Sequence, residues 1–155
     1  MLRSSEDGKY GRASRRILLT TDVARLDVAA VHAYLTTSYW AEGIPLETLE
    51  RSLQGSICFG LLHGARQVGF ARIISDGATF AYLADVYVLE EFRGQDLGKW
   101  MMACMKKHPD LQGLRRWMLA TRDAHGLYQQ YGFQPLAKPE RFMEILDPDV
   151  YGRRS

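Results

Sequence analysis

One stretch of this chain decides its fold, residues 85–100, which read DVYVLEEFRGQDLGKW. Its first part has the valine-rich character of a strand, and its last part begins a helix. Gly94 and Gly98 lie at the junction, where glycine lets the backbone approach a ligand closely. Unpaired N–H groups in the first turn of a helix attract anions, as does the helix dipole. We therefore expect this turn to bind a phosphate group, with Arg93 and Lys99 adding positive charge.

Two other phosphate-binding motifs do not fit this turn. It lacks the G-x-x-x-x-G-K-[ST] spacing of a P-loop. It also lacks G-x-G-x-x-G and lies late in the chain, which argues against a dinucleotide-binding unit. A turn with a purely structural role remains the alternative reading.

Outward from this turn, the order of elements predicts a single α/β (α+β) domain. The pattern predicts strands at 17–19, 57–63, 67–74, 79–89, 115–121, 133 and 141–146, and helices at 22–35, 45–53, 96–107 and 124–131. Short turns join the three central strands, so the sheet should be mixed and mostly antiparallel, with helices flanking it. We expect the domain to span residues 15–155, after a flexible tail at 1–14.

Composition narrows the class of protein. The 155 residues are 46% hydrophobic and 25% charged, and 20 basic against 18 acidic residues are too balanced for a nucleic-acid binder. No apolar run approaches the roughly 20 residues of a membrane span, and no signal peptide is visible. Cys58 and Cys104 lie in apolar runs, as buried reduced thiols do, and no spacing indicates a metal site. These features predict a cytoplasmic protein without membrane or nucleic-acid partners.

Two segments resemble the acetyl-CoA-binding motifs of the Gcn5-related N-acetyltransferase (GNAT) superfamily. The first family motif is usually (Q/R)-x-x-G-x-(G/A), and Arg93 and Gly98 match its first and last positions. Asp96 stands where the family has glycine. A carboxylate there would repel a pyrophosphate, unless its side chain turns aside and caps the helix.

The second segment, residues 121–133, reads TRDAHGLYQQYGF and is similar to the family's N-x-x-A-x-x-L-Y-x-x-x-G-F. Its matching residues are Ala124, Leu127, Tyr128, Gly132 and Phe133, and Thr121 replaces the usual Asn. The stretches S-Y-W-A, G-F-A-R and 79–133 extend the resemblance to small bacterial members of unassigned substrate.

The resemblance implies acetyl-CoA as a co-substrate and a strand that parts from its neighbour. Backbone groups of residues 86–88 would receive the pantetheine arm, and residues 95–99 the pyrophosphate. The cofactor-binding residues implied in this way are Val86, Tyr87, Val88, Arg93, Gly94, Gln95, Asp96, Leu97, Gly98, Lys99, Thr121 and Tyr128.

Two residues are candidates for the chemistry. In the family a Tyr at the position of Tyr128 protonates the departing thiolate, and a phenol with a pKa near 10 suits that role. Its alternative role is to pack its ring on the sheet. Asp85 lies within an apolar strand, where a carboxylate needs a partner or water. It is either the base or the partner of Arg72 in an ion pair, since family members also deprotonate the amine through water.

The resemblance places Tyr39 and Trp40 at the start of a loop over the acceptor site. Their rings, with Glu42, could hold a cationic amine by cation–π contact and charge. They could equally be core residues that close the first helix. His125 lies one helical turn before Tyr128 and either flanks the same site or is a surface residue.

The predicted function is direct transfer of the acetyl group of acetyl-CoA to a primary amine of a small molecule. Asp96 favours a non-catalytic acyl-CoA-binding module, and Tyr128 with Asp85 favours an enzyme. Acetylation of a protein lysine or N-terminus is a third alternative. The sequence leaves a homodimer open.

Overall fold

The computed structural model describes residues 16–152 and contains one five-stranded sheet. The predicted tail at 1–14 lies outside these residues. The strands are β1 (Ile17–Thr20), β2 (Ile57–His63), β3 (Arg66–Ser75), β4 (Phe80–Val88) and β5 (Arg116–Leu119), in the spatial order β1-β2-β3-β4-β5. Neighbours from β1 to β4 are antiparallel, and β4 and β5 are parallel. The prediction of a mixed, mostly antiparallel sheet is confirmed.

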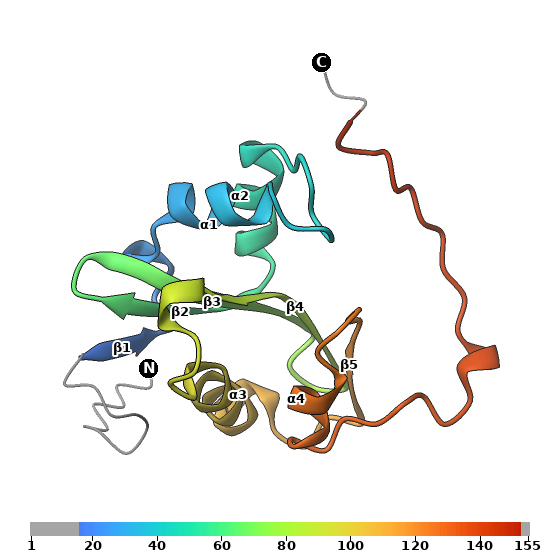
Figure 1. Cartoon of the computed structure of the whole chain (residues 1–155). Coiled ribbons are helices and arrows are strands. Elements are labelled where there is room, and N and C mark those ends of the chain that lie inside the picture. The colour runs from blue at the N-terminus through green and yellow to red at the C-terminus, as the bar shows by residue number, and fades with distance from the viewer. Residues whose placement is uncertain (1–15, 153–155) are drawn as a thin grey trace.

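Helices cover both faces of the sheet (Figure 1). Two of them, α1 (Val28–Leu35) and α2 (Leu46–Gln54), lie over one face, and α3 (Leu97–Lys107) and α4 (His125–Gln129) lie over the other. Short 3-10 turns occupy Val23–Arg25, Glu90–Phe92, Pro109–Leu111 and Pro139–Arg141. None of the helices described is long and apolar enough to cross a membrane.

Each layer of helices has its own core. Leu35 and Leu49 pack with Phe70 beneath α1 and α2, and all three side chains are fully buried. Phe59 packs with Met101 and other residues of α3 on the opposite face. The prediction that helices flank the sheet is confirmed, and the sheet is buried on both faces.

The helix predicted from Asp22 to Leu35 is divided in two. Asp22 accepts a hydrogen bond from the Ala24 amide at 3.0 Å and starts the first 3-10 turn. Leu26 is extended, and Asp27 then caps α1 through the Ala30 amide at 3.0 Å. The continuous helix was a wrong prediction because two successive aspartate caps each start a new turn.

A β-bulge in β4 changes the face of Asp85. Phe70 pairs with Tyr87, but Arg72 pairs with Ala84, so Asp85 and Val86 together face one residue of β3. Asp85 has φ +57°, in the left-handed region that most side chains avoid. Strict alternation predicted Leu83, Asp85 and Tyr87 on one face. The structure corrects this, because Leu83 joins the core beneath α3 and Tyr87 the core beneath α1 and α2.

Beyond this bulge, β4 separates from β5. Pairing runs from Phe80 with Arg116 to Leu83 with Leu119, and residues 84–88 have no β5 partner in the described part of the chain. The expected incomplete ladder is therefore present, and it leaves backbone groups of β4 available at the centre of the sheet.

The closing strands predicted at Phe133 and 141–146 are absent from the described residues. After α4 the chain runs away from the sheet in an extended form and turns once at Pro139–Arg141 (Figure 1). Met143 and Ile145 are 98% and 104% exposed. Their alternation is typical of a strand, but a strand also needs a hydrogen-bonded neighbour.

Candidate active site

The turn between β4 and α3 holds its backbone open to solvent. Gly94 has φ +78° and Asp96 φ +59°, and α3 begins at Leu97 with Asp96 as its N-cap. A Cβ atom added to Gly94 or Gly98 would meet no atom within 4 Å. Glycine adopts this left-handed backbone without strain, which explains why the family motif favours it at the position of Asp96. Aspartate tolerates the same backbone with some strain.

The side chain of Asp96 does not cap the helix. It makes no capping hydrogen bond and instead lies 3.6 Å from the Lys99 ammonium group, with both side chains about half exposed. The alternative in which Asp96 turns aside as a cap is therefore wrong. The Asp96 carboxylate therefore lies at the turn and forms an ion pair with Lys99, the lysine that was expected to add positive charge for a phosphate.

Arg93 stabilises the turn by two side-chain hydrogen bonds. Its Nε donates a hydrogen bond to the Val88 carbonyl at 2.9 Å, and its Nη2 donates to the Tyr34 hydroxyl at 3.2 Å. The guanidinium group thus ties the turn to the end of β4 and to α1, while remaining exposed at the surface.

A cavity of about 820 Å³ extends from this turn along the freed part of β4. We call it the coenzyme cleft. The predicted cofactor residues that line it are Val86, Tyr87, Val88, Arg93, Gly94, Asp96, Leu97, Gly98, Lys99 and Tyr128. Gln95 and Thr121 are not among its lining residues.

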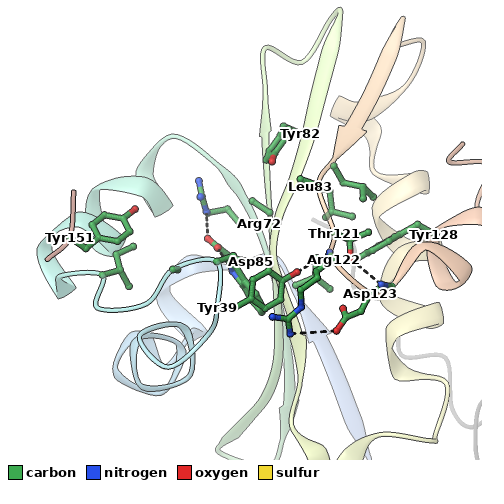
Figure 2. Close-up of a pocket in the computed structure, with 18 residues that line it drawn as sticks. Tyr39, Arg72, Tyr82, Leu83, Asp85, Thr121, Arg122, Asp123, Tyr128 and Tyr151 are labelled. Carbon is green, nitrogen blue, oxygen red and sulfur yellow. Dashed lines mark hydrogen bonds and ion pairs between the residues drawn. The ribbon is translucent and has the colours of Figure 1, made fainter. Parts of the chain in front are cut away.

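A second cavity of about 680 Å³ lies beside residues 82–86 of β4 and adjoins the first, and we call it the acceptor pocket (Figure 2). Asp85 and Arg72 lie on one wall, Thr121 and Tyr128 on the other. Tyr39 and Trp40 line it, whereas Glu42 is exposed and lines neither cavity. Tyr82 and Tyr151 also line it, and the sequence analysis assigned a site role to neither.

Tyr128 lies where the two cavities meet. It lines both, is 8% exposed, and packs edge-on against Phe133 with ring centroids 5.9 Å apart. Burial, followed by the nearby phenol of Tyr39, raises the pKa of Tyr128 to about 12. His125, one turn earlier, lines neither cavity and is exposed.

Asp85 forms the predicted ion pair with Arg72. The Arg72 Nε lies 2.8 Å from Asp85 Oδ2, and the two side chains are 15% and 9% exposed. Trp40 donates from Nε1 to Asp85 Oδ1 at 3.0 Å. The pair satisfies a carboxylate that would otherwise be costly in this strand, and it also holds the Trp40 ring over the acceptor pocket.

Tyr39 joins two loops above the meeting point of the cavities. Its hydroxyl accepts a hydrogen bond from the Arg122 amide at 3.1 Å, and the Arg122 guanidinium carbon lies 4.0 Å from the centre of its ring. Tyr39 and Trp40 are 48% and 41% exposed, so the alternative in which they are core residues is wrong. Arg122 escaped the sequence analysis because it occupies a variable position of the second motif.

Comparison with known proteins identifies the family. Residues 54–135 match the family model described as acetyltransferase (GNAT) domain. A Gibberella zeae protein named "putative acetyltransferase" is 39% identical over 72% of this chain and 75% of its own length. This chain belongs to the GNAT acetyltransferase family.

Solved structures agree with this assignment. A GNAT-family protein from Xanthomonas campestris is 49% identical, with a TM-score of 0.86 over 88% of this chain and 96% of its own. A Clostridium acetobutylicum protein solved with acetyl-CoA is 15% identical, with a TM-score of 0.63 over 84% of this chain and 96% of its own, so it shows the shared fold alone.

Proposed function

We propose that this protein transfers the acetyl group of acetyl-CoA directly to a primary amine of a small molecule. The observation that carries this proposal is the meeting of two cavities at Tyr128. One ends at the turn before α3, and the other is lined by aromatic rings and a carboxylate. Direct transfer requires such an arrangement, because the amine and the thioester must reach the same point from different sides.

The coenzyme cleft is the proposed site of acetyl-CoA. The first turn of α3 presents its N–H groups to the pyrophosphate beside Gly94 and Gly98, where added Cβ atoms would meet open space. The pantetheine arm follows residues 86–88 of β4, which lack a β5 partner among the described residues. The Clostridium acetobutylicum protein, which shares the fold, was solved with acetyl-CoA.

In the proposed reaction one carbon–nitrogen bond forms, one carbon–sulfur bond breaks, and one proton passes from the amine to the thiolate. The unprotonated amine attacks the thioester carbonyl, the carbon–sulfur bond breaks, and the proton lost by the amine is balanced by the proton that the coenzyme thiolate gains. With a pKa of about 12, Tyr128 keeps its proton throughout the neutral range. An ordinary thiol has a pKa near 8.5, so full proton transfer from this phenol to sulfur is uphill. We infer that its hydroxyl stabilises the leaving thiolate mainly by donating a hydrogen bond.

The acceptor pocket suits a small cationic amine. Each oxygen of Asp85 has one protein partner, from Arg72 or Trp40, and retains a lone pair for an ammonium N–H or for water. The proton of the amine would leave through this carboxylate. Aromatic rings of Tyr39 and Trp40 add cation–π attraction. The volume of about 680 Å³ is typical of small-molecule sites.

An acyl-CoA-binding module without turnover is the second candidate, and Asp96 is the observation that favours it. Its carboxylate lies at the mouth of the turn that would receive a pyrophosphate. If the protein is such a binding module, we expect the Asp96 carboxylate to weaken or alter coenzyme binding.

A panel of amines tests the proposal, with release of free coenzyme A thiol as the readout. The panel should include small primary amines, a lysine peptide and a peptide with a free N-terminus. Acetylation of a small amine supports the proposal, whereas turnover with the peptides alone assigns the protein acceptor. Thiol release without any amine would be hydrolysis and would not count as transfer.

Thermal unfolding with acetyl-CoA separates binding from turnover. A ligand that binds only the folded state raises the melting temperature, by about 2.7 kcal/mol of stability at 100 times its Kd. We expect a concentration-dependent increase. Such an increase without turnover on any amine supports the binding module, and no increase at millimolar acetyl-CoA contradicts both functions.

A further inference from the structure

The carboxylate of the acceptor pocket is in contact with a positive charge. Arg72 Nε lies 2.8 Å from Asp85 Oδ2, and both side chains are largely buried. A guanidinium group at this distance offsets much of the attraction that the carboxylate exerts on a cation. A ligand with an ammonium group alone therefore gains little net electrostatic energy from the pair, whereas a ligand that carries both charges gains from each partner.

Arg72 retains one donor nitrogen for a ligand. Its Nε donates to Asp85 and its Nη1 to Ser56 Oγ at 3.0 Å, while Nη2 makes no hydrogen bond to a described residue. Every fully buried side-chain nitrogen or oxygen among the described residues has a partner, so Nη2 is accessible, and Arg72 lines the acceptor pocket. Guanidinium groups bind carboxylates through short, charge-assisted hydrogen bonds. Arg72 can therefore bind an anionic group without releasing Asp85.

Two tyrosine hydroxyls add further donors to the same pocket. Tyr82 of β4 and Tyr151 near the end of the described chain are partly buried, and both line it. Neither hydroxyl makes a hydrogen bond to a described residue, and neither is fully buried. In the view of Figure 2, the guanidinium group of Arg72 lies between these two tyrosines. The three side chains together can donate hydrogen bonds to one carboxylate.

The charges of the pocket as a whole are balanced. Its lining contains two arginines and two aspartates, which form two ion pairs. Arg72 pairs with Asp85, and Arg122 Nη2 lies 3.8 Å from Asp123 Oδ2. Such a lining is complementary to a zwitterion, since each charge of the ligand finds an opposite charge and the ligand adds no net charge to the pocket.

We propose that the acceptor is an α-amino acid with an apolar side chain. Its amino group contacts Asp85, and its carboxylate accepts hydrogen bonds from Arg72 Nη2 and from the hydroxyls of Tyr82 and Tyr151. Because the charges of Arg72 and Asp85 are in contact, the two charges of the ligand must also be close, as they are when amine and carboxylate share one carbon atom. The inference rests on the proposed transfer to a small amine and narrows the acceptor to one chemical class.

The rest of the lining indicates an apolar side chain on this amino acid. The rings of Tyr39 and Trp40 lie 5.1 Å apart, edge to face, and both remain partly exposed to the pocket. Ala41 and Ile44 line the same pocket and are buried. An aliphatic or aromatic side chain removes apolar surface from water on these groups and leaves no polar group of its own unpaired.

Matched acceptors test the role of the carboxylate. Leucine and phenylalanine are compared with isoamylamine and phenethylamine, which lack only the carboxylate, and with the two amino-acid amides, in which it is neutral. From the strength of hydrogen bonds to charged groups, we expect kcat/KM to be roughly 10–100-fold higher for the amino acids. The amides carry an α-amino group with a pKa of about 7.7–8.0 and so supply more free amine, which biases the comparison against the proposal. Transfer to all acceptors without preference for the amino acids overturns this inference and leaves the proposed function standing.

Single-oxygen variants test the proposed carboxylate site. Tyr82→Phe and Tyr151→Phe should each raise KM for leucine by about 10-fold and leave KM for isoamylamine unchanged. A merely structural role of either hydroxyl would alter KM for both acceptors alike. The matched control is Tyr131→Phe, whose hydroxyl lines neither cavity and which should change KM for neither acceptor. An unchanged KM for leucine in both variants overturns the carboxylate site.

Calorimetric titration with coenzyme A present separates this inference from the proposed function, because no acetyl group is then available for transfer. We expect leucine to bind at least about 10-fold more tightly than isoamylamine, and the preference to diminish in Tyr82→Phe. If this preference is found but no acceptor is acetylated, the proposed transfer fails and the amino-acid site stands. Equal affinity for the two ligands, or acetylation of peptides alone, overturns the amino-acid site.

Discussion

At the scale of single residues, the hydroxyl of Tyr128 is the group best placed for chemistry. It belongs to a buried side chain that lines both cavities, and its raised pKa keeps it protonated near neutrality. The ring also packs on Phe133, so the oxygen and the ring have separable functions. A single-atom change can therefore separate chemistry from packing.

Tyr128→Phe should lower turnover by roughly 10²–10³-fold, as expected for loss of one hydrogen-bond donor to the leaving thiolate, and leave acetyl-CoA affinity nearly unchanged. Steady-state kinetics with an identified amine, combined with calorimetric binding of the coenzyme, measures both. The matched control is Tyr131→Phe. The Tyr131 hydroxyl lines neither cavity and donates instead to the Lys99 carbonyl at 2.8 Å, away from the thioester, so turnover should be retained. An unaffected rate in Tyr128→Phe would show that the thiolate leaves without help from this hydroxyl.

Asp96 combines a charge and a strained backbone, and two substitutions separate them. Asp96→Asn removes the charge and keeps a side chain that tolerates φ +59°, so coenzyme binding should tighten by about 0.3–1 kcal/mol. Asp96→Gly should tighten binding similarly and also remove the left-handed strain. Calorimetric titration with coenzyme A measures the change. Weaker binding in both variants would show instead that Asp96 is needed to orient Lys99, its neighbour at 3.6 Å.

At the scale of elements, the bulge in β4 is what separates β4 from β5 and opens the site. It places Asp85 at φ +57° and lets one carboxylate reach both Arg72 and Trp40. Bulges often occur beside active sites because they redirect a side chain and end strand pairing. Here both effects are present within one strand.

The stability of an Asp85 variant should therefore depend on how well the new residue tolerates the left-handed backbone, as well as on the loss of charge. Asp85→Ala should be less stable than Asp85→Asn by about 1 kcal/mol, because alanine tolerates the left-handed region poorly. Both should lower turnover while coenzyme binding persists. Urea unfolding at neutral pH gives the order of stability. Equal stability would mean that the bulge relaxes, and full activity of Asp85→Asn would contradict a role for the carboxylate in taking the proton.

At the scale of the whole molecule, several buried groups must stay protonated for the fold to be stable. Burial raises the pKa of Tyr128 to about 12 and that of Cys58 to about 11, and it raises the pKa of Tyr87 as well. Each folded-state pKa lies above its unfolded value. The stability that each group contributes is thus complete below the unfolded pKa and is lost as the pH rises through the folded one.

The free energy of unfolding should therefore fall as the pH rises from about 9 to 12. Between the ordinary pKa of 10.0 and about 12, Tyr128 alone accounts for a loss of about 2 kcal/mol, because the unfolded chain releases its proton first. Urea unfolding at several pH values measures the slope. Tyr128→Phe should show a shallower slope than the wild type, and equal slopes would mean that this phenol is not protected from ionisation.

Local patterns by themselves determined most of the framework. The turn at 93–98, the start of α3 near residue 96 and the three central strands follow from short-range spacing, and the structure agrees with them within a few residues. Tyr128 could be placed in a helix beside the site because its motif is contiguous. These features depend on neighbours in the chain, so the sequence contains enough information to predict them.

Tertiary structure alone decided the rest, because these features need partners distant in the chain. The bulge at Asp85 depends on the register between β3 and β4, and Tyr39 meets Arg122 across 83 positions. The segment 141–146 has the alternation of a strand, yet it pairs with no strand in the described part of the chain. Alternation specifies only which side chains share a face. Whether that face is covered is set by the free energy of contacts that a linear pattern does not specify.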